Sequence, residues 1–536
     1  MKYSQWFLLI FMLGTFATGY TETPFITSTL PILVITTENL VVIPDEPKIQ
    51  AHLGIVWHED GGLNSSHDAF NHYDGWIGIE KRGNMSQNFP KLPYTFETRL
   101  DNGENNNVKL LGLPKENDWI LRAGFIDKTL MRDALAYRLG RATGHWAPRT
   151  RHCEVILNDV YIGVYTLVES IKPDKNRLNI EKMDEDDIAG DSLTGGYIYE
   201  VSQDGPDFGQ RRRYVYPSAS DITNEQSDYI RDYEEEFRRV MRGSNCANPQ
   251  SGYATWIDVD SFIDEILVQE AVKNSDAYGW SSYFHKDRLG KLCAGPLWDF
   301  DQALSNSTFN DGPKIDEWII EKSEYDGWLD QNYPSFWNQL WYEPAFKHRL
   351  ADRWAELRRG PFRSDIVSGI IDSLATHLAD AQERNFQTWP VLGQELWRST
   401  PGWEQRDTYQ KEVDYLNVFL MDRMTWMDEQ LLSAASVEPM EVSSVMAPAL
   451  IVNPTPSSGI NWFNYTLKQD GLVELSIYNI RGRLVKNMVQ QFQQRGKYAV
   501  CWNGLDQSES VIAPGLYFSV LCQDGMILNR TKWIRF

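Results

Sequence analysis

Cysteine is scarce in this 536-residue chain. The five cysteines are Cys153, Cys246, Cys293, Cys501 and Cys522. None of them forms a CxxC pair, so the spacing argues against a zinc knuckle and a dithiol redox motif. In an oxidising compartment Cys501 and Cys522 could bridge within a C-terminal domain, and the odd number leaves at least one thiol over.

Several widespread catalytic motifs are also missing. The chain has no GxxxxGK[ST] loop, no HExxH pair and no GxSxG elbow. These absences argue against a P-loop nucleotidase, a zincin and an α/β-hydrolase. Any catalytic residues must therefore be sought outside these patterns.

Positive charge is in deficit. Lysine and arginine number 52 against 74 aspartates and glutamates, a formal charge of −22. An acidic surface repels phosphate backbones and anionic lipid headgroups, so we expect no nucleic acid partner and no membrane-surface partner.

Long hydrophobic runs are absent except at the N-terminus. Lys2, the apolar stretch Trp6–Phe16 and the small residues Ala17-Thr18-Gly19 predict a signal peptide over residues 1–20. No later segment has 18 uninterrupted apolar residues, so the mature protein is expected to be exported without an integral membrane segment.

The remainder predicts an α+β chain with more than one domain. Residues 25–435 are β-rich to about residue 205 and helical afterwards, which favours two lobes with a ligand cleft between them. The first part is expected to be a mostly antiparallel β layer. Its expected strands are Leu30–Ile35, Asn39–Val42, Ala51–Trp57, Trp76–Glu80, Tyr94–Thr98, Cys153–Leu157 and Tyr161–Val168, and its first helix is Thr129–Leu139.

Residues 436–446 are rich in Ser, Ala, Pro and Val and predict a linker. Beyond it, residues 447–536 contain short apolar stretches separated by glycine turns. These are Leu472–Tyr478, Leu484–Val485, Tyr498–Trp502 and Leu516–Leu521. The pattern predicts a small all-β sandwich.

The strongest catalytic candidates are aspartates on either side of a predicted hairpin. Asp276 follows the helix that begins near Val259, and Asp299 and Asp301 follow the hairpin Ser281–Ala294. A hairpin returns its second strand beside its first, so Asp276 and Asp299 can approach each other. Phosphoryl transfer uses such a pair: one carboxylate orients or deprotonates the attacking group and another holds magnesium on the phosphates.

A basic turn in the β-rich part supplies complementary charge. Lys81 and Arg82 precede the small polar residues Gly83 and Asn84, and Lys91 follows them. Backbone N–H groups in such a turn, with Lys91 on the following strand, can hold phosphate oxygens. A solvated loop is the alternative.

Taken together, nine short motifs between Ile77 and Asn306 resemble the spore-coat protein H (CotH) kinase family. They are Arg82-Gly83-Asn84, Phe89-Pro90-Lys91, Leu110-Leu111-Gly112-Leu113-Pro114-Lys115, Asp118-Trp119, Leu130-Met131-Arg132, Ala147-Pro148-Arg149-Thr150, Tyr161-Ile162-Gly163-Val164-Tyr165, Gly195-Gly196-Tyr197 and Trp298-Asp299-Phe300-Asp301. One such motif would be uninformative, whereas nine in order are specific.

The resemblance implies an atypical two-lobed kinase-like fold that uses ATP and Mg²⁺ or Mn²⁺ to phosphorylate Ser or Thr of extracellular or surface proteins. It also implies site roles. Asp276 matches the catalytic aspartate and Asp299 a metal ligand, with Asp301 completing the Asp-Phe-Asp segment. The remaining candidates are Lys91, Arg82 and Asn84 for the phosphates and Glu169 near the adenine.

Two departures from the family pattern leave a pseudokinase or surface scaffold open. Leu92 stands where the family usually has a second lysine, and Asp133 stands where it has asparagine. Asp133 adds negative charge near the presumed nucleotide site unless Arg132 or a metal offsets it. Twenty tryptophans leave a carbohydrate-active protein as another alternative, with Trp337, Trp341, Trp354, Trp389, Trp397 and Trp403 as candidate sugar platforms.

The last domain has a resemblance of its own. Asn453-Pro454, Tyr478-Asn479-Ile480-Arg481-Gly482, Trp502-Asn503-Gly504 and Ala513-Pro514-Gly515-Leu516-Tyr517-Phe518 are similar to the C-terminal sorting domain of type IX secretion, and Lys532 lies near the end. The resemblance implies recognition by the type IX machinery and secretion to, or attachment at, the outer surface of a Gram-negative bacterium.

Overall fold

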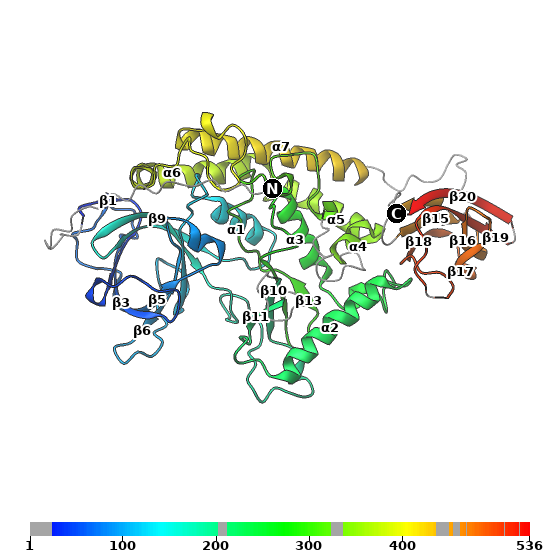
Figure 1. The fold of residues 1–536 in the computed structure, drawn as a ribbon, viewed down its shortest axis with the longest axis horizontal. Coiled ribbons are helices and arrows are strands. Elements are labelled where there is room, and N and C mark those ends of the chain that lie inside the picture. Colours follow the sequence, from blue (N-terminus) through cyan, green and yellow to red (C-terminus); the bar gives the residue numbers. More distant parts are fainter. Residues whose placement is uncertain are drawn as a thin grey trace, which may run out of the picture.

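A computed structural model describes residues 24–201, 212–322, 336–435, 450–453, 461–467, 469–508, 510–524 and 526–535. The predicted signal peptide and the predicted linker lie outside these ranges, as does residue 447, where the last domain was expected to begin. Helices and sheets alternate along the described chain (Figure 1), which confirms a mixed α and β protein. No helix within these ranges is long and apolar enough to cross a membrane.

Seven strands of the β-rich part close into a barrel with the order β2-β3-β5-β6-β7-β9-β8. They are β2 (Ile32–Thr37), β3 (Ile49–Val56), β5 (Tyr73–Lys81), β6 (Tyr94–Arg99), β7 (Asp118–Arg122), β8 (Thr150–Leu157) and β9 (Val160–Glu169), and the short strands β1 (Thr27–Ser28) and β4 (Asn64–Ser65) pair beside them. The mostly antiparallel layer expected from the sequence is confirmed, and the structure adds that it closes on itself. β2 pairs in parallel with β8, and this single parallel pair closes the barrel.

Side-chain alternation fills the barrel. Ile77 and Ile79 of β5 and Phe96 of β6 are buried in one apolar cluster with Trp119 of β7. The expected strand Asn39–Val42 is wrong, because the chain there forms the short 3₁₀ helix Glu38–Leu40. Residues 38–42 are all exposed, so this segment has no side chains packed against the barrel as a strand would.

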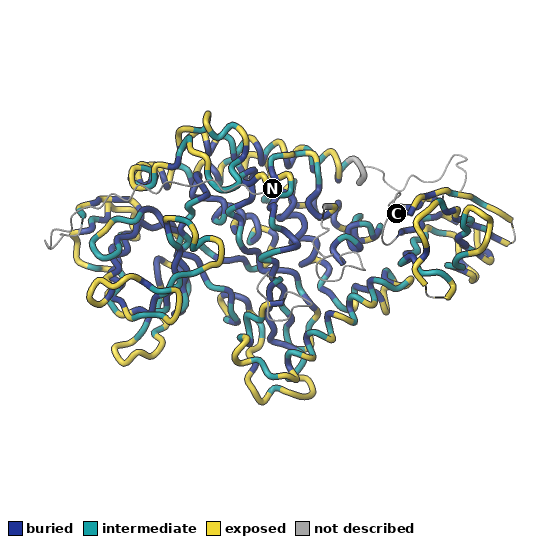
Figure 2. The backbone as a smooth tube through the Cα atoms, viewed as in Figure 1, coloured by how far each residue is buried: buried dark blue, intermediate teal, exposed yellow. Residues whose placement is uncertain are grey.

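Beside the barrel, the described residues form seven helices and a separate four-stranded sheet of order β11-β10-β12-β13. The helices are α1 (Arg132–Ala142), α2 (Asn224–Arg242), α3 (Val259–Ala271), α4 (Phe336–Tyr342), α5 (Pro344–Arg359), α6 (Ser364–Thr388) and α7 (Tyr409–Ala435). The strands are β10 (Tyr197–Val201), β11 (Arg212–Tyr216), β12 (Ser282–Lys286) and β13 (Leu292–Ala294). The predicted hairpin between Ser281 and Ala294 is thus β12–β13. Helix α3 is buried along most of its length in the largest core (Figure 2).

Helix α6 ties the barrel to the helical part. Its Arg384 forms an ion pair with Glu154 of β8. The next residue of α6 and the residue that follows the helix both bind β9. The side chain of Asn385 accepts from the Val164 amide (3.1 Å), and the Trp389 indole donates to the Ile162 carbonyl (3.0 Å). Because Glu154 is fully buried, this contact fixes the barrel against the helices.

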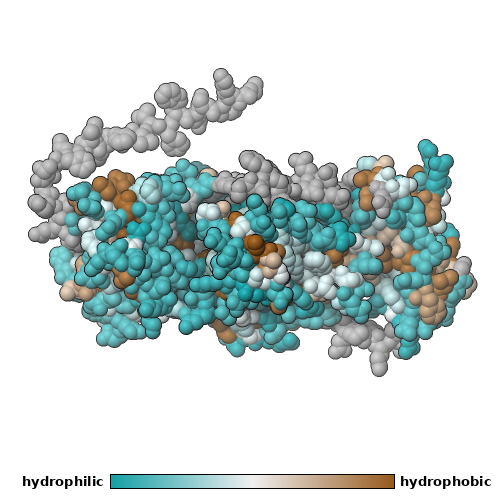
Figure 3. Space-filling model, turned by 90° about the horizontal axis from the view of Figure 1, so that it is seen from below, coloured by the Kyte–Doolittle hydropathy of each residue, from teal (hydrophilic) through white to brown (hydrophobic). Residues whose placement is uncertain are grey.

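The C-terminal residues form two antiparallel sheets, β14-β15-β18 and β17-β16-β19-β20. The strands are β14 (Leu450–Asn453), β15 (Asn461–Leu467), β16 (Gly471–Asn479), β17 (Leu484–Gln493), β18 (Gly496–Trp502), β19 (Gly515–Gln523) and β20 (Met526–Arg535). Both sheets contribute to one core that includes Phe463, Leu475 and Trp533. Apolar side chains also gather on the surface at this end of the molecule (Figure 3).

The bridge between Cys501 and Cys522 that the sequence left possible is not formed in the structure. Cys501 lies on β18 of the three-stranded sheet, and Cys522 lies on β19 of the other sheet. The Cys501 sulfur instead contacts that of Cys246 at 2.8 Å. Cys246 follows α2 in the second part, so the contact joins the two domains.

Candidate active site

The chain after α3 and the chain after β13 meet at Asn274. Its side-chain amide donates to the Asp299 carbonyl (3.3 Å), and its side-chain oxygen accepts from the Asp276 amide (3.3 Å). Ser275 Oγ also donates to the Gln302 carbonyl at 3.2 Å. The bonds to the Asp299 and Gln302 carbonyls bring the two segments together, so Asp276, Asp299 and Asp301 belong to one cluster.

The Asp276 carboxylate has one satisfied oxygen and one unsatisfied oxygen. Oδ2 accepts from Gln302 Nε2, whereas Oδ1 is buried without a hydrogen-bond partner. Gln302 is itself held by Arg398, whose Nη1 donates to Gln302 Oε1 at 3.0 Å. Burial and the neighbouring Asp299 charge raise the pKa of Asp276 to about 7. A carboxylate with this pKa can gain or lose a proton near neutral pH.

Asp299 is kept ionised. Burial would raise its pKa, but the Arg122 guanidinium and a Ser281 hydrogen bond outweigh burial and lower it. Arg122 Nη2 lies 2.5 Å from Asp299 Oδ1, and Ser281 Oγ donates to Oδ2 at 3.2 Å. Asp299 also has a left-handed backbone, with φ of +65°. Such a conformation costs about 1–3 kcal/mol in a non-glycine residue and is common at functional sites.

Arg122, at the end of β7, is the hub of the cluster and was missed by the sequence analysis. Its Nε lies 2.9 Å from Asp133 Oδ2, and its Nη2 also lies 3.8 Å from Asp301 Oδ2. Asp133 in turn accepts from the Phe300 amide at 2.8 Å. One guanidinium therefore joins the barrel, α1 and the Asp299–Asp301 segment. From the sequence, the only signal for this residue is that Arg122 is the charged residue at which the apolar strand Asp118–Arg122 ends.

The negative charge of Asp133 is offset by Arg122, whereas Arg132, one of the two groups that the sequence suggested for this role, pairs with another carboxylate. Arg132 Nη1 pairs with Asp127 at 2.5 Å, and Arg132 Nε donates to the Ala303 carbonyl at 3.0 Å. Burial raises the pKa of Asp133, while Arg122 opposes that shift. Asp133 thus positions the loop that follows Asp299.

Arg82 is the other predicted residue that reaches this cluster. Its Cζ lies 5.0 Å from the centre of the Trp298 ring, and Arg122 Cζ lies 5.7 Å from the same centre. The Arg82 charge also contributes to the lowered pKa of Asp299. Two guanidiniums beside one indole provide donors suited to phosphate oxygens. Asn84 is exposed and leads into the 3₁₀ turn Met85–Asn88.

Lys91 is not placed with these residues. Its Nζ donates to the Val164 carbonyl (2.5 Å) and to Asn385 Oδ1 (2.9 Å), between β9 and α6. Burial lowers the pKa of Lys91 to about 7. Its side chain, which is 2% exposed, holds the barrel to α6 in this structure.

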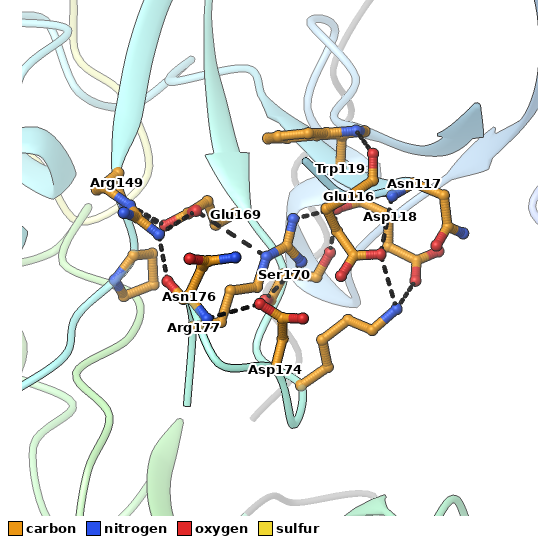
Figure 4. Close-up of polar contacts among 12 residues, drawn as sticks. Glu116, Asn117, Asp118, Trp119, Arg149, Glu169, Ser170, Asp174, Asn176 and Arg177 are labelled. Atoms are coloured by element: carbon orange, nitrogen blue, oxygen red, sulfur yellow. Dashed lines mark hydrogen bonds and ion pairs between the residues drawn. The ribbon is translucent and has the colours of Figure 1, made fainter. Parts of the chain in front are cut away.

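Glu169 is likewise engaged elsewhere, as Figure 4 shows. Both of its carboxylate oxygens accept from Arg149, whose Nε lies 2.8 Å from Oε2 and whose Nη2 lies 2.7 Å from Oε1. Arg177 Nε lies 4.0 Å away on the other side. Glu169 is fully buried in this network, which leaves its carboxylate no open oxygen for a nucleotide.

The carboxylates of Asp299 and Asp301 could supply some of the ligands of a magnesium ion. Within the described residues, no three His, Cys, Asp or Glu side chains converge as a metal cage. Magnesium is usually held by only one or two carboxylates, together with phosphates and water. Asp299 and Asp301 can supply those carboxylates, since both side chains keep more than a quarter of their surface exposed.

A large cavity in the described structure does not contain these aspartates. It has a volume of about 980 Å³ and is lined mainly by the loop before β7 and the segment after β9, with Trp57, Glu59 and His72. Strand β7 separates it from the site, because Asp118 begins the strand on the cavity side and Arg122 ends it at Asp299. We place the active site at the carboxylate cluster. Its two aspartates have pKa values shifted in opposite directions, and one oxygen of Asp276 has no hydrogen-bond partner.

The tryptophan platforms expected for a carbohydrate-active protein are partly ruled out. Trp337, Trp341 and Trp354 are buried in the helical core and cannot stack on a sugar. Trp389, Trp397 and Trp403 are half-buried. The indole of Trp389 binds β9 and serves the interface described above.

Paired carboxylates with opposed pKa shifts, flanked by guanidiniums, are the groups that a phosphotransferase needs. Residues 79–427, well over half of the chain, match the family described as CotH kinase protein. The chain belongs to the CotH kinase family, which confirms that part of the sequence resemblance. The family implies a kinase-like phosphotransferase that uses ATP and a divalent metal.

Other comparisons add little. No curated protein matches the chain. Among solved structures, dimeric latent PorU from Porphyromonas gingivalis is 21% identical over 18% of this chain and 10% of its own, with a TM-score of 0.15. The alkylpurine DNA glycosylase AlkC from Pseudomonas fluorescens, bound to DNA with an abasic site analog, is 11% identical over 41% of this chain and 67% of its own, with a TM-score of 0.14. TM-scores this low support no argument.

Proposed function

We propose that this protein is an exported kinase that transfers the γ-phosphate of ATP to Ser or Thr hydroxyls of extracellular or surface proteins. One observation carries the proposal. Asp276, with an unsatisfied oxygen and a pKa of about 7, lies beside Asp299, which Arg122 keeps ionised. Membership of the CotH kinase family supports the same chemistry.

In this proposal Asp276 acts on the substrate hydroxyl. Its ionised form accepts the hydroxyl proton at Oδ1 as the substrate oxygen bonds to the γ-phosphorus and the bond from that phosphorus to the ADP oxygen breaks. Gln302 and Asn274 hold Asp276 in place through its Oδ2 and its backbone amide. No other hydrogen bond competes for Oδ1 within the described residues.

Charge neutralisation falls to the groups around Trp298. Arg82 and Arg122 would donate to the phosphate oxygens, in place of the Lys91 ammonium that the sequence suggested. Asp299 and Asp301 would hold a divalent metal, which when bound supplies positive charge against the phosphates.

The proposed site residues come from two parts of the molecule, which favours a two-lobed, kinase-like arrangement. Arg82 and Arg122 come from the barrel, whereas Asp276 and Asp299 come from the helical part. A nucleotide held between the two sets would lie at the junction of the lobes. The non-catalytic alternatives, a pseudokinase or a surface scaffold, would not need an ionised Asp299 beside a protonatable Asp276.

We extend the proposal to export. The signal peptide at residues 1–20 and the motifs of the last domain favour passage through the type IX secretion machinery to the outer surface of a Gram-negative bacterium. The sandwich of two sheets sharing one core is compatible with a sorting domain.

The test combines nucleotide binding with transfer. Calorimetry should detect Mg-ATP binding to the full chain and weaker binding to Asp299→Asn, while Asp276→Asn should bind ATP normally and form no phosphoprotein. Phosphoprotein is measured by phosphosite mass spectrometry of the chain and of added secreted proteins. Equal phosphorylation by wild type and Asp276→Asn would rule out the proposed base, and no binding of Mg-ATP would favour a scaffold.

A further inference from the structure

The contact between the two domains contains a pair of cysteines. Cys246, in the loop after α2, is 1% exposed, and Cys501 on β18 is also 1% exposed. Their sulfur atoms lie 2.8 Å apart, although 255 positions separate them in the chain. No other two cysteine sulfurs are in contact in the part of the chain that the structure describes.

The surroundings hold the pair in place. Trp462 of β15 completes a small buried cluster with the two cysteines, and Tyr342 at the end of α4 packs against it. Cys501 Sγ also lies 2.6 Å from the Gly243 carbonyl at the end of α2. Figure 1 shows α2 reaching toward β18, the only strand of its sheet that carries a cysteine. The approach therefore depends on packing from both domains.

We propose that Cys246 and Cys501 form a disulfide that links the kinase domain covalently to the C-terminal domain. In the reaction both S–H bonds break and one S–S bond forms. The disulfide of an extracytoplasmic thiol oxidoreductase, or glutathione disulfide in vitro, takes up the two electrons and two protons, and its S–S bond breaks to give two thiols. An exported chain meets such oxidants.

The cross-link has a consequence for processing. Residues 436–449 are the only covalent connection between the domains in the reduced chain. With the disulfide formed, a cut in that segment would leave the C-terminal domain attached until a reductant acts. Separation of the two domains would then require both cleavage of this segment and reduction of the disulfide.

A site-specific protease sequence inserted between residues 440 and 446 tests this. The full chain is refolded with glutathione and glutathione disulfide, alkylated, cut, and run on a denaturing gel. Without reductant the two fragments should migrate together, and with dithiothreitol they should separate. Peptide mapping should recover a Cys246–Cys501 peptide.

Matched variants sharpen the result. Cys246→Ser should release the fragments without reductant, whereas Cys522→Ser should keep them linked. Separation of the wild-type fragments without reductant, or a Cys501–Cys522 peptide, would overturn the proposal. Because both variants keep the same number of remaining cysteines, random thiol pairing cannot produce this difference.

A second, independent observation concerns the 980 Å³ cavity. Five lysines line it in a chain whose net charge is −22: Lys109, Lys115, Lys172, Lys175 and Lys182. Only three acidic side chains line it with them, Glu59, Glu116 and Asp174. Lys172 is neutralised by Glu116 (3.1 Å) and Asp118 (2.5 Å). The other four have no carboxylate within ion-pair distance among the described residues.

A buried amide in the same cavity also lacks a partner. Asn117 is 4% exposed, and its Nδ2 has no hydrogen-bond acceptor. Figure 4 shows Asn117 beside Glu116 and Asp118, away from the Arg149–Glu169 pair. A buried N–H donor without a partner is favoured by a hydrogen-bond acceptor, and the lysines around this one favour an acceptor that carries negative charge.

We infer that this lysine cleft binds an acidic segment of a partner polypeptide. The cavity is far larger than one inorganic anion needs, since a water molecule occupies only about 30 Å³ of liquid. Its lysines come from two separate segments, the loop before β7 and the segment after β9, so several carboxylates along an extended chain would match them. This inference does not depend on the kinase proposal.

Binding of a fluorescein-labelled ten-residue glutamate peptide to the full chain, followed by anisotropy, tests the inference. The combined variant Lys109→Gln, Lys115→Gln and Lys175→Gln should weaken binding about tenfold at low salt, since it removes three exposed charge pairs that each contribute modestly. The control variant Lys411→Gln, Lys497→Gln and Lys532→Gln changes net charge equally and should bind as wild type does.

Salt and competitors complete the test. Affinity should fall as ionic strength rises, because exposed charge pairs are screened. Equal affinity of the two triple variants would overturn the inference. Stronger binding of a sulfated polysaccharide, or displacement of the peptide by low concentrations of inorganic phosphate, would also overturn it by identifying a different ligand.

Discussion

Replacing Asp276 by asparagine should make the protein more stable while removing its activity. The wild-type carboxylate is destabilised when ionised, because Oδ1 is buried without a donor and Asp299 is negative nearby. Asparagine at this position keeps an oxygen for Gln302 Nε2. It places an N–H group where the carboxylate has an unpaired oxygen. The substitution therefore removes a buried charge and leaves the surrounding contacts in place.

The magnitude follows from the pKa. The carboxyl group of Asp276 has a pKa of 3.8 in the unfolded chain and about 7 in the folded one. Between these two pH values the folded state binds more protons than the unfolded state, so the folded protein loses stability as pH rises from about 4 to 7. At 1.36 kcal/mol per pKa unit, the cost at pH 8 is about 4 kcal/mol, of which about 2 kcal/mol develops between pH 5.5 and 8. The uncharged asparagine does not incur this cost.

Urea unfolding of both proteins at pH 5.5 and pH 8 measures the effect. Asp276→Asn should be the more stable protein at both pH values, with the larger advantage at pH 8. The exposed Asp372 on α6 provides a control, since Asp372→Asn should change stability little and equally at both pH values. A stability difference for Asp276→Asn that does not grow with pH would refute the reasoning.

Three further predictions concern the same site. The kcat/KM for phosphorylation should rise with pH and level off above about 7, because Asp276 accepts a proton only when ionised; a flat initial-rate profile would contradict this. Arg122→Met should lower the unfolding free energy by about 3 kcal/mol, since it leaves the largely buried Asp133 without its ion-pair partner and removes one of two guanidiniums that favour ionised Asp299; urea titration should show the loss, and Arg122→Lys should recover part of it. Lys91→Met should lower Tm by calorimetry and leave the KM for ATP unchanged, because Nζ binds Val164 and Asn385; a large rise in KM would restore Lys91 to the phosphate site.

Much of the local structure was predictable because it depends on short-range patterns. The strand near Trp76 and the two strands on either side of Asn158-Asp159 appear where expected, and both of these turn residues have positive φ. The hairpin β12–β13 also lies where predicted, so Asp276 and Asp299 could be paired from sequence. Hairpin geometry is local, and a hairpin relates its two flanking segments directly.

Long-range partners were not predictable in the same way. The barrel closes through a parallel pair between β2 and β8, which are far apart in the chain. Arg122 meets Asp299 across 177 positions, and Lys91 meets Asn385 across 294. No periodicity within a segment specifies which distant charge it will face. For this reason Lys91 was assigned to the phosphates from its motif alone, whereas the structure places Arg122 beside Asp299.

The central claim is that this cluster transfers a phosphate from ATP to a protein hydroxyl. Parallel incubations of the full chain with Mg²⁺ and ATP labelled at either the γ- or the α-phosphate, for wild type and Asp276→Asn, test it most directly. The account predicts protein labelling from γ-labelled ATP only, and none with Asp276→Asn. Label transferred from the α-phosphate, or equal γ-labelling by the variant, would contradict it.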